Sequence, residues 1–172
     1  MKTFTKSIIA AAMVFCAGTA AQATDLEPVD VPEDAGLYLR ADIGWAFLDW
    51  SGGSEDDGIV AGGGIGYHFN DMLRADIRAD FDGIDSVLGN LYFDFDTGTS
   101  FTPYIGAGAG YGWASVDNGS DLDGFAFALM AGVGFDFSEN LTLDVGYRFR
   151  ELMDSGPDVM SHEVLAGLRF EF

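Results

Sequence analysis

The sequence predicts an all-β protein, an eight-stranded antiparallel up-and-down transmembrane β-barrel. Segments about ten residues long, the length of a membrane-crossing strand, alternate apolar and polar positions. The large aromatic residues gather near the ends of the apolar rows, where a membrane barrel carries its two aromatic girdles. Glycine and arginine lie on the opposite rows, which suits a narrow lumen where small residues make room for large ones.

The pattern of residues 1–23 predicts a secretory signal peptide that is cleaved off. Lys2 and Lys6 supply its basic start, and an apolar run too short to cross a membrane as a helix follows. Ala21-Gln22-Ala23 supplies a small-residue cleavage site. Cys16 is the only cysteine and lies inside this segment. The exported chain is therefore expected to fold without a disulfide.

The rest of the chain is strongly acidic. Residues 24–35 are expected to form an acidic periplasmic N-terminal segment, and residues 36–172 the barrel. After residue 23, six arginines and no lysine oppose 28 acidic residues, a formal charge of −22. Such a surface repels nucleic acid, so no nucleic-acid partner is expected. The acidity itself fits either solubility in a saline habitat or cation binding.

Four strands are expected in the first half of the barrel, at residues 36–48, 58–69, 73–82 and 86–95. Apolar residues or glycine occupy every second position of these strands, from Leu37 to Phe47, from Ile59 to Phe69, from Leu73 to Phe81 and from Val87 to Phe95. No charge interrupts these rows. Each segment therefore has one face suited to hydrocarbon.

Four further strands are expected at residues 101–114, 125–137, 141–150 and 162–172. Their apolar rows run from Phe101 to Trp113, from Phe125 to Phe137, from Leu141 to Phe149 and from Val164 to Phe172. Short turns follow the second, fourth and sixth strands, and mostly longer loops follow the others. Outer-membrane barrels show this arrangement, with the short turns in the periplasm.

Alternation alone fits a soluble barrel with its apolar rows inside as well as a membrane barrel with them outside. The absence of lysine after residue 23 favours the membrane barrel, because solvent-facing strands normally carry lysine, whereas enclosed ion pairs favour arginine. The aromatic girdles agree. The residues expected at the membrane interfaces are Phe47, Phe69, Phe81, Phe95, Phe101, Trp113, Phe125, Phe137, Phe149 and Phe172.

The inner rows carry both signs of charge. We expect them to form a paired network that plugs the lumen, because unpaired charge in a narrow interior is costly. The lumen glycines leave open a thin water path and, with it, a small-solute channel. The residues expected in the network are Arg40, Asp42, Arg74, Asp76, Arg78, Asp80, Asp94, Asp136, Asp144, Arg148, Arg150, Arg169 and Glu171.

The stretches GLYLRADIGWAF, NLYFDF, TPYIGAGAGYGW, LTLDVGYRFR and HEVLAGLRFEF resemble the small eight-stranded outer-membrane barrels, both the OmpA/OmpX-type barrel domain and the opacity-protein-like surface antigens. The resemblance covers residues 36–172. The final strand, with Phe172 preceded by an apolar residue at every second position, resembles the signal read by the outer-membrane insertion machinery. The resemblance to these families implies a location in the outer membrane of a Gram-negative bacterium.

Candidate chemistry is sparse. Ser161-His162-Glu163 invites a nucleophile interpretation, but adjacent residues of an extended segment point to opposite faces, so no catalytic residue and no enzyme activity are expected. His68 is expected to be a hydrogen-bonded residue near one rim of the lumen. Modification of lipid A is the least favoured alternative function.

Acidic residues gather in the expected outer loop DNGSDLDG. Its carboxylates Asp117, Asp121 and Asp123 are oxygen ligands of the kind that Ca²⁺ and Mg²⁺ take, but the loop lacks the bidentate glutamate of an EF-hand. Either a weakly bound cation bridges to lipopolysaccharide, or the acids are simply solvated; otherwise no cofactor is expected. The favoured function is a structural and surface-antigen role among outer-membrane lipids and lipopolysaccharide.

Overall fold

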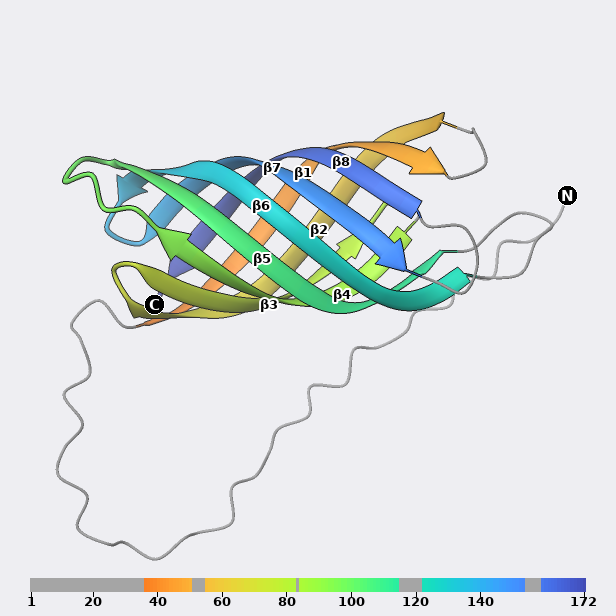
Figure 1. Ribbon diagram of the computed structural model, residues 1–172. Coiled ribbons are helices and arrows are strands. Elements are labelled where there is room, and N and C mark those ends of the chain that lie inside the picture. The colour runs from red at the N-terminus through yellow and green to blue at the C-terminus, as the bar shows by residue number, and fades with distance from the viewer. Residues whose placement is uncertain (1–35, 51–54, 83, 115–121, 154–158) are drawn as a thin grey trace, which may run out of the picture. The chain divides into compact units, whose positions relative to one another are not determined.

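The computed structural model describes residues 36–50, 55–82, 84–114, 122–153 and 159–172. Within them, eight strands form one closed antiparallel barrel in chain order (Figure 1). The expected fold class is confirmed. The predicted signal peptide and acidic N-terminal segment lie outside the described residues.

Every strand pairs with its neighbours along the chain, and the last strand closes the ring by pairing with the first. In the described part of the chain, no helix is long and apolar enough to cross a membrane. The strands are β1 (Gly36–Trp50), β2 (Glu55–Asn70), β3 (Leu73–Phe81), β4 (Ile84–Asp94), β5 (Phe101–Ala114), β6 (Leu122–Ser138), β7 (Leu141–Met153) and β8 (Val159–Glu171).

The short turns and the C-terminus share one end of the barrel, the short-turn end, at the left of Figure 1. Side chains shape these turns: Asn70 Oδ1 accepts hydrogen bonds from the backbone nitrogens of Met72 and Leu73, each 2.9 Å long. In the turn after β4, Gly98 has a φ of 67°, which glycine adopts without a Cβ clash. The opposite end is the long-loop end. Outer-membrane barrels place their short turns in the periplasm.

Several strands reach further toward the long-loop end than their apolar rows predict. β2 begins at Glu55 and β6 at Leu122, three residues earlier than expected in each case, while β7 continues to Met153. The hairpin ladder simply continues, for example with Asp49 opposite Glu55. Backbone pairing needs no apolar side chain, so the loss of the apolar pattern marks the edge of the hydrocarbon rather than the end of the strand.

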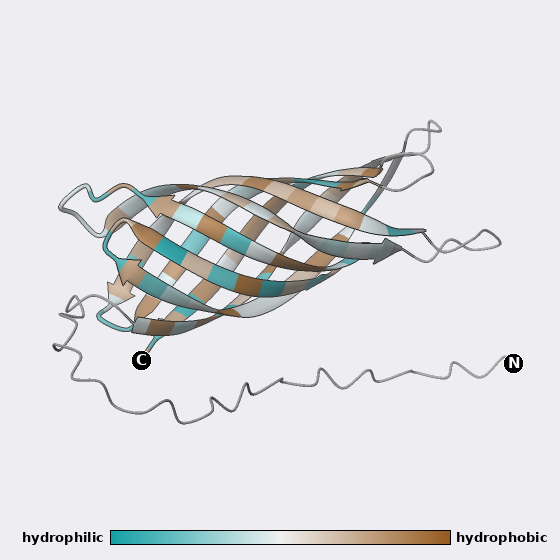
Figure 2. Cartoon of the chain, turned by 60° about the horizontal axis from the view of Figure 1, so that its bottom comes forward, coloured by the Kyte–Doolittle hydropathy of each residue, from teal (hydrophilic) through white to brown (hydrophobic). Residues whose placement is uncertain are grey.

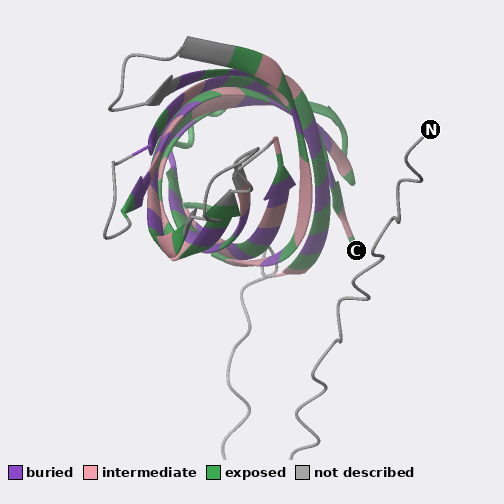
Figure 3. Cartoon of the chain, turned by 90° about the vertical axis from the view of Figure 1, so that its right-hand side faces the viewer, coloured by how far each residue is buried: buried purple, intermediate pink, exposed green. Residues whose placement is uncertain are grey.

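The two faces of every strand have opposite environments (Figures 2 and 3). On β3, Ile77 is 63% exposed, whereas the neighbouring Arg78 is 1% exposed. The same alternation holds around the barrel, with apolar residues outside and charged residues enclosed. A soluble barrel would show the reverse, so the apolar rows face lipid.

All ten aromatic residues expected at the membrane interfaces point outward. Nine are exposed, and Phe149 is half-buried because its ring lies 5.3 Å from that of His162. At the short-turn end, outward rings also pack along the same strand, as do Phe170 and Phe172 with centroids 5.4 Å apart. Aromatic rings therefore gather in pairs on the outer surface at this end.

The strand register sets the tilt of the strands around the lumen. Following ladder partners once around the barrel from Leu39 returns to β1 at Asp49, ten residues further along. With eight strands, this stagger tilts the strands strongly, and the small number of strands keeps the interior narrow. Inward glycines relieve the crowding. A Cβ added to Gly110 would lie only 2.0 Å from the backbone oxygen of Val87.

We predict opposite outcomes for two glycines on adjacent strands. Gly110→Ala is expected to lower the free energy of unfolding by about 1–3 kcal/mol, because backbone atoms must move to admit the methyl group. Gly89→Ala is the matched control: its Cβ would point outward, 3.9 Å from the nearest atom. Urea unfolding in detergent micelles, followed by the heat-modifiable gel band, measures both. Equal stability of the two variants would contradict the close approach at Gly110.

Candidate functional site in the barrel lumen

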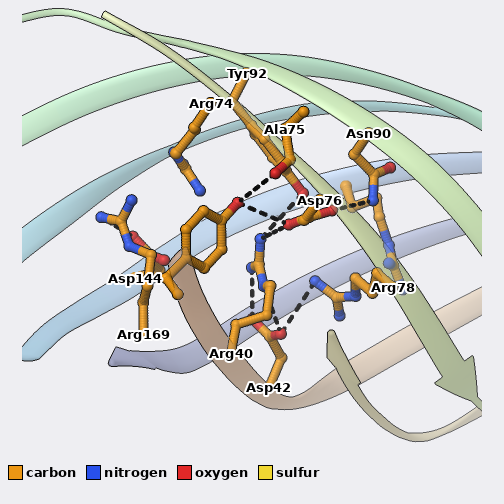
Figure 4. A network of polar contacts seen from close by, with 12 residues as sticks. Arg40, Asp42, Arg74, Ala75, Asp76, Arg78, Asn90, Tyr92, Asp144 and Arg169 are labelled. Carbon is orange, nitrogen blue, oxygen red and sulfur yellow. Dashed lines mark hydrogen bonds and ion pairs between the residues drawn. The ribbon is translucent and has the colours of Figure 1, made fainter. Parts of the chain in front are cut away.

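The middle of the lumen is organised by Arg40 on β1 (Figure 4). Its Nη2 lies 2.8 Å from Asp42 Oδ1, and its Nη1 lies 3.0 Å from Asp76 Oδ2 on β3. Nη1 also donates to Tyr92 Oη at 3.0 Å. Asp76 is held further by Asn90, whose Nδ2 donates to Oδ1 at 2.6 Å. Arg40 thus joins three strands of the barrel.

Two more arginines extend this arrangement toward the long-loop end. Arg78 on β3 lies 3.3 Å from Asp42 Oδ2 and 2.7 Å from Asp80 Oδ1. Arg148 on β7 reaches across the lumen to Asp80 Oδ2 at 2.8 Å. Its other terminal nitrogen lies 2.5 Å from Glu163 on β8. Each arginine therefore bridges two carboxylates, and each carboxylate is shared.

The series ends near the long loops. Arg150 Nη2 lies 3.0 Å from Glu163 Oε1 and closer still to Asp82. Its Nη1 donates to Ser86 Oγ at 2.7 Å, and Ser161 Oγ donates to Glu163 at 2.9 Å. Burial raises the pKa of Asp82, although Arg150 opposes that shift. We call the alternating series the lumen chain: Asp76, Arg40, Asp42, Arg78, Asp80, Arg148, Glu163, Arg150 and Asp82.

A second group of charges lies nearer the short-turn end. Arg74 pairs through Nε with both oxygens of Asp94, at 2.8 and 3.1 Å. Its guanidinium stacks on Tyr92 and Tyr104, with centroid distances of 4.2 and 5.0 Å. Its two terminal nitrogens are buried without a hydrogen-bond partner in the described structure, as are both carboxylate oxygens of Asp144. Nη2 of Arg78 and Nη2 of Arg148 in the lumen chain are likewise buried without a hydrogen-bond partner in the described structure, although each lies within ion-pair distance of a carboxylate.

The short-turn end opens into a polar vestibule of about 670 Å³, lined among others by His68, Arg169 and Glu171. Asp136 also lines it. The sequence analysis placed Asp136 in the paired network, but it is exposed and accepts a hydrogen bond from Thr142 Oγ1 at 2.7 Å instead. The ladder of β6 against β7 is regular as far as the Asp136–Thr142 pair, so Asp136 keeps its inward-facing register position near the short-turn end of the strand. That part of the prediction was wrong.

The opposite end of the lumen is apolar, which the sequence analysis did not anticipate. Leu48, Leu152 and Val159, at the long-loop ends of their strands, are almost fully enclosed, and Val60 and Leu88 lie on the same inner surface. We call these five residues the apolar cap. Between the apolar cap and the vestibule, the described lumen contains a cavity of about 10 Å³, the size of one water molecule. The cap was detectable in principle, because these residues alternate with the lipid-facing row.

Some charged members of the network were also missed. Glu163 and the uncharged Ser86 were not among the residues expected to pair, although alternation puts Glu163 on the inner row of β8. Ser161 and His162 point to opposite faces as expected: Ser161 is enclosed, whereas His162 Nδ1 lies 2.5 Å from Tyr147 Oη on the outer surface. No Ser–His contact is available for nucleophilic chemistry at this position.

The outer surface near the long loops pairs aromatic donors with carboxylates. Trp45 Nε1 donates to Asp57 at 3.0 Å, and Tyr111 Oη donates to Asp123. Asp117 and Asp121, the other two predicted cation ligands, lie outside the described residues. Among the residues that are described, no three acidic, histidine or cysteine side chains are grouped to hold a metal ion.

Comparison with known proteins decides the family. The model of the outer membrane protein beta-barrel domain matches residues 7–172. The chain belongs to this family. Together with its outer-membrane relatives, this places the protein in the bacterial outer membrane, as the resemblance implied.

Relatives of this outer-membrane barrel agree with the assignment. An uncharacterized protein of Brucella abortus is 29% identical over 265 residues, covering 90% of this chain and 93% of that protein. Opacity protein opA67 of Neisseria gonorrhoeae is 28% identical over 140 residues, 60% of each chain. The crystal structure of Neisserial surface protein A is 29% identical with a TM-score of 0.73, covering 81% of this chain and 100% of that one.

We predict that Arg148→Met destabilises the barrel by about 3–5 kcal/mol, because it leaves Asp80 and Glu163 enclosed without their shared cation. Adding Glu163→Gln should recover part of the loss, since one uncompensated charge then disappears. Glu163→Gln alone is the matched control. Urea unfolding in micelles, followed by tryptophan fluorescence, tests the set. A double variant no more stable than Arg148→Met would contradict the coupling.

Proposed function

We propose that this outer-membrane barrel is a sealed, non-enzymatic protein with a structural and surface-antigen role. The observation that carries the proposal is the interior: the lumen chain crosses the barrel, and the apolar cap lies between it and the long loops. A solute that enters the vestibule meets enclosed ion pairs first and apolar side chains next. Both must be displaced for passage, at the cost of unpaired buried charge.

A small-solute channel is the second candidate, favoured only by the vestibule. Its volume of about 670 Å³ admits a small solute, and the inward glycines reduce the bulk of the wall. Beyond it, however, the described lumen holds a cavity of about 10 Å³. Access from one end alone gives a recess and not a pore.

The surface role rests on the long-loop end and on the relatives. The loop after β5 is the longest connection between strands, and acidic residues lie in the loops after β5 and β7 and at the start of β2. The relatives include opacity proteins and a protein named as a surface protein. A lipid A-modifying enzyme is the least supported candidate, because Ser161 hydrogen-bonds Glu163 inside the lumen and faces away from His162.

Three partners follow from this proposal. The lipid-facing rows contact outer-membrane lipids, and the acidic long-loop end faces lipopolysaccharide through shared divalent cations. The insertion machinery reads the last strand. Support for this last partner lies in the position of the C-terminus: Phe172 N donates to Leu37 O at 3.1 Å, so the final residue extends the seam that closes the barrel.

Planar-bilayer recording tests the sealed interior. The purified barrel is expected to give no stable single-channel steps, because the lumen chain and the apolar cap leave no continuous water path. A heat-modifiable gel band from the same preparation confirms that the inserted protein is folded. Stable, large steps from folded protein would overturn the sealed interior and favour the channel.

Cation bridging is tested by replacing the loop carboxylates. We predict that Asp117→Asn/Asp121→Asn/Asp123→Asn reduces Ca²⁺-dependent co-sedimentation of lipopolysaccharide with barrel-containing vesicles severalfold. EDTA should have the same effect on the wild type, because hard cations need these oxygen ligands.

The matched control removes three acids at the other end, with Asp71→Asn/Asp96→Asn/Glu139→Gln. All three are exposed at the short-turn end. This variant is expected to retain lipopolysaccharide as the wild type does. Equal loss in both variants would show that net charge alone is responsible, and no loss in either would leave the loop acids merely solvated.

A further inference from the structure

His68 at the short-turn mouth has two competing neighbours on β8. Its Nε2 lies 3.1 Å from Arg169 Nη1 and 3.3 Å from Glu171 Oε1. The Arg169 guanidinium remains protonated and offers only donors, whereas the Glu171 carboxylate offers only acceptors when ionised. A single ring nitrogen cannot accept from one and donate to the other at the same time. The protonation state of His68 therefore selects its partner.

The neutral and charged imidazoles satisfy different contacts. In the neutral tautomer whose lone pair is on Nε2, this nitrogen accepts a hydrogen bond from Arg169. After protonation, Nε2–H donates to Glu171, and two adjacent cations repel each other. Histidine is the side chain whose ordinary pKa allows this change between pH 5 and 8.

A second carboxylate is available to Arg169. Its Nη2 lies 3.6 Å from Asp144 Oδ1, within ion-pair distance but too far for a hydrogen bond, and its Nε lies 3.8 Å from Glu171 Oε1. Both oxygens of Asp144 are buried without a hydrogen-bond partner in the described residues, and the side chain is 3% exposed. A buried carboxylate without a hydrogen-bond partner is destabilising, so Asp144 gains from a closer contact with the neighbouring guanidinium. Asp144 is thus the natural acceptor for Arg169 once His68 releases it.

Other charged and titratable groups surround His68. The Tyr38 ring on β1 packs 5.0 Å from the imidazole, and Arg74 is its ladder partner on β3. Asp94 on β4 compensates Arg74 through their ion pair. The vestibule also holds the acids of the mouth, so protons and water reach His68 from the short-turn side. Opposing charges around the imidazole leave Arg169 and Glu171 as the direct contacts that change.

We propose that protonation of His68 transfers Arg169 from His68 to Asp144, so that the short-turn mouth of the barrel responds to pH. In the neutral state Arg169 lies across the vestibule toward β2. In the protonated state it pairs with β7, and His68 pairs with Glu171. The transfer exchanges one set of contacts for another without unfolding any strand.

Nuclear magnetic resonance of the ¹⁵N-labelled full barrel in micelles tests the transfer. A His162→Gln background leaves His68 as the single imidazole. Between pH 8 and 5, the imidazole signals of His68 and the Nε–H signal of Arg169 should titrate with the same midpoint. An Arg169 signal that stays constant while His68 titrates would overturn the proposal.

Three variants distinguish the transfer from simple electrostatics. Glu171→Gln and Asp144→Asn should each move the midpoint of the Arg169 signal to lower pH, because each removes a partner of the protonated state. Asp136→Asn is the matched control, an exposed vestibule acid that contacts Thr142 and not Arg169. An equal shift for Asp136→Asn and Asp144→Asn would overturn the role of Asp144.

His68→Gln keeps the test decisive if a carboxylate variant does not fold. The glutamine side chain offers Arg169 a permanent acceptor and has no charge to gain. The Arg169 signal should then be constant between pH 8 and 5. If it titrates as in the parent protein, His68 is not the source of the change, and the proposal fails.

Discussion

Charge enclosed in a narrow lumen must find a partner, because the barrel wall and the lipid around it supply no solvent to replace one. The lumen chain meets this constraint by alternating arginines with carboxylates. Its links run from β3 to β1, back to β3, and then across the lumen to β7 and β8. The Asp80–Arg148 contact of 2.8 Å joins strands that are not neighbours in the barrel, so the chain braces opposite walls as well as filling the space between them.

The small inward residues and the lumen chain depend on each other. Large arginine and tyrosine side chains fit only because glycine faces them: an added Cβ at Gly66 would lie 2.2 Å from the Tyr38 ring. Glycine weakens a strand, so these positions lower the strand propensity of the chain. They also leave the space that the large inward side chains fill. The outer rows bear no such conflict, because lipid accepts any apolar shape. Sequence choice is therefore tighter inside the barrel than outside.

Alternation was enough to assign the face of most residues, including Ile77 outside and Arg78 inside. It could not say which charges meet. Asp80 and Arg148 are 68 residues apart, and their contact depends on the ten-residue stagger that only the paired strands reveal. Alternation also could not show that Asp136 is exposed near the end of its strand and has Thr142 as its hydrogen-bond partner. The apolar cap was missed because the inward-facing row was expected to be polar along its whole length. Contact with lipid requires only that the outward-facing row be apolar, and it does not require the inward-facing row to be polar.

The two ends of the lumen differ in how completely their groups are satisfied. Toward the long loops, every arginine of the lumen chain bridges two carboxylates, and apolar side chains exclude water. Toward the short turns, Arg74 and Asp144 retain buried atoms without hydrogen bonds, and the vestibule admits solvent. A buried arginine can exchange one partner for another at low free-energy cost only where a second acceptor without a hydrogen bond lies nearby. The enclosed ion pairs therefore brace the part of the lumen toward the long loops, while His68 at the short-turn mouth lies beside Arg169, Glu171 and the vestibule.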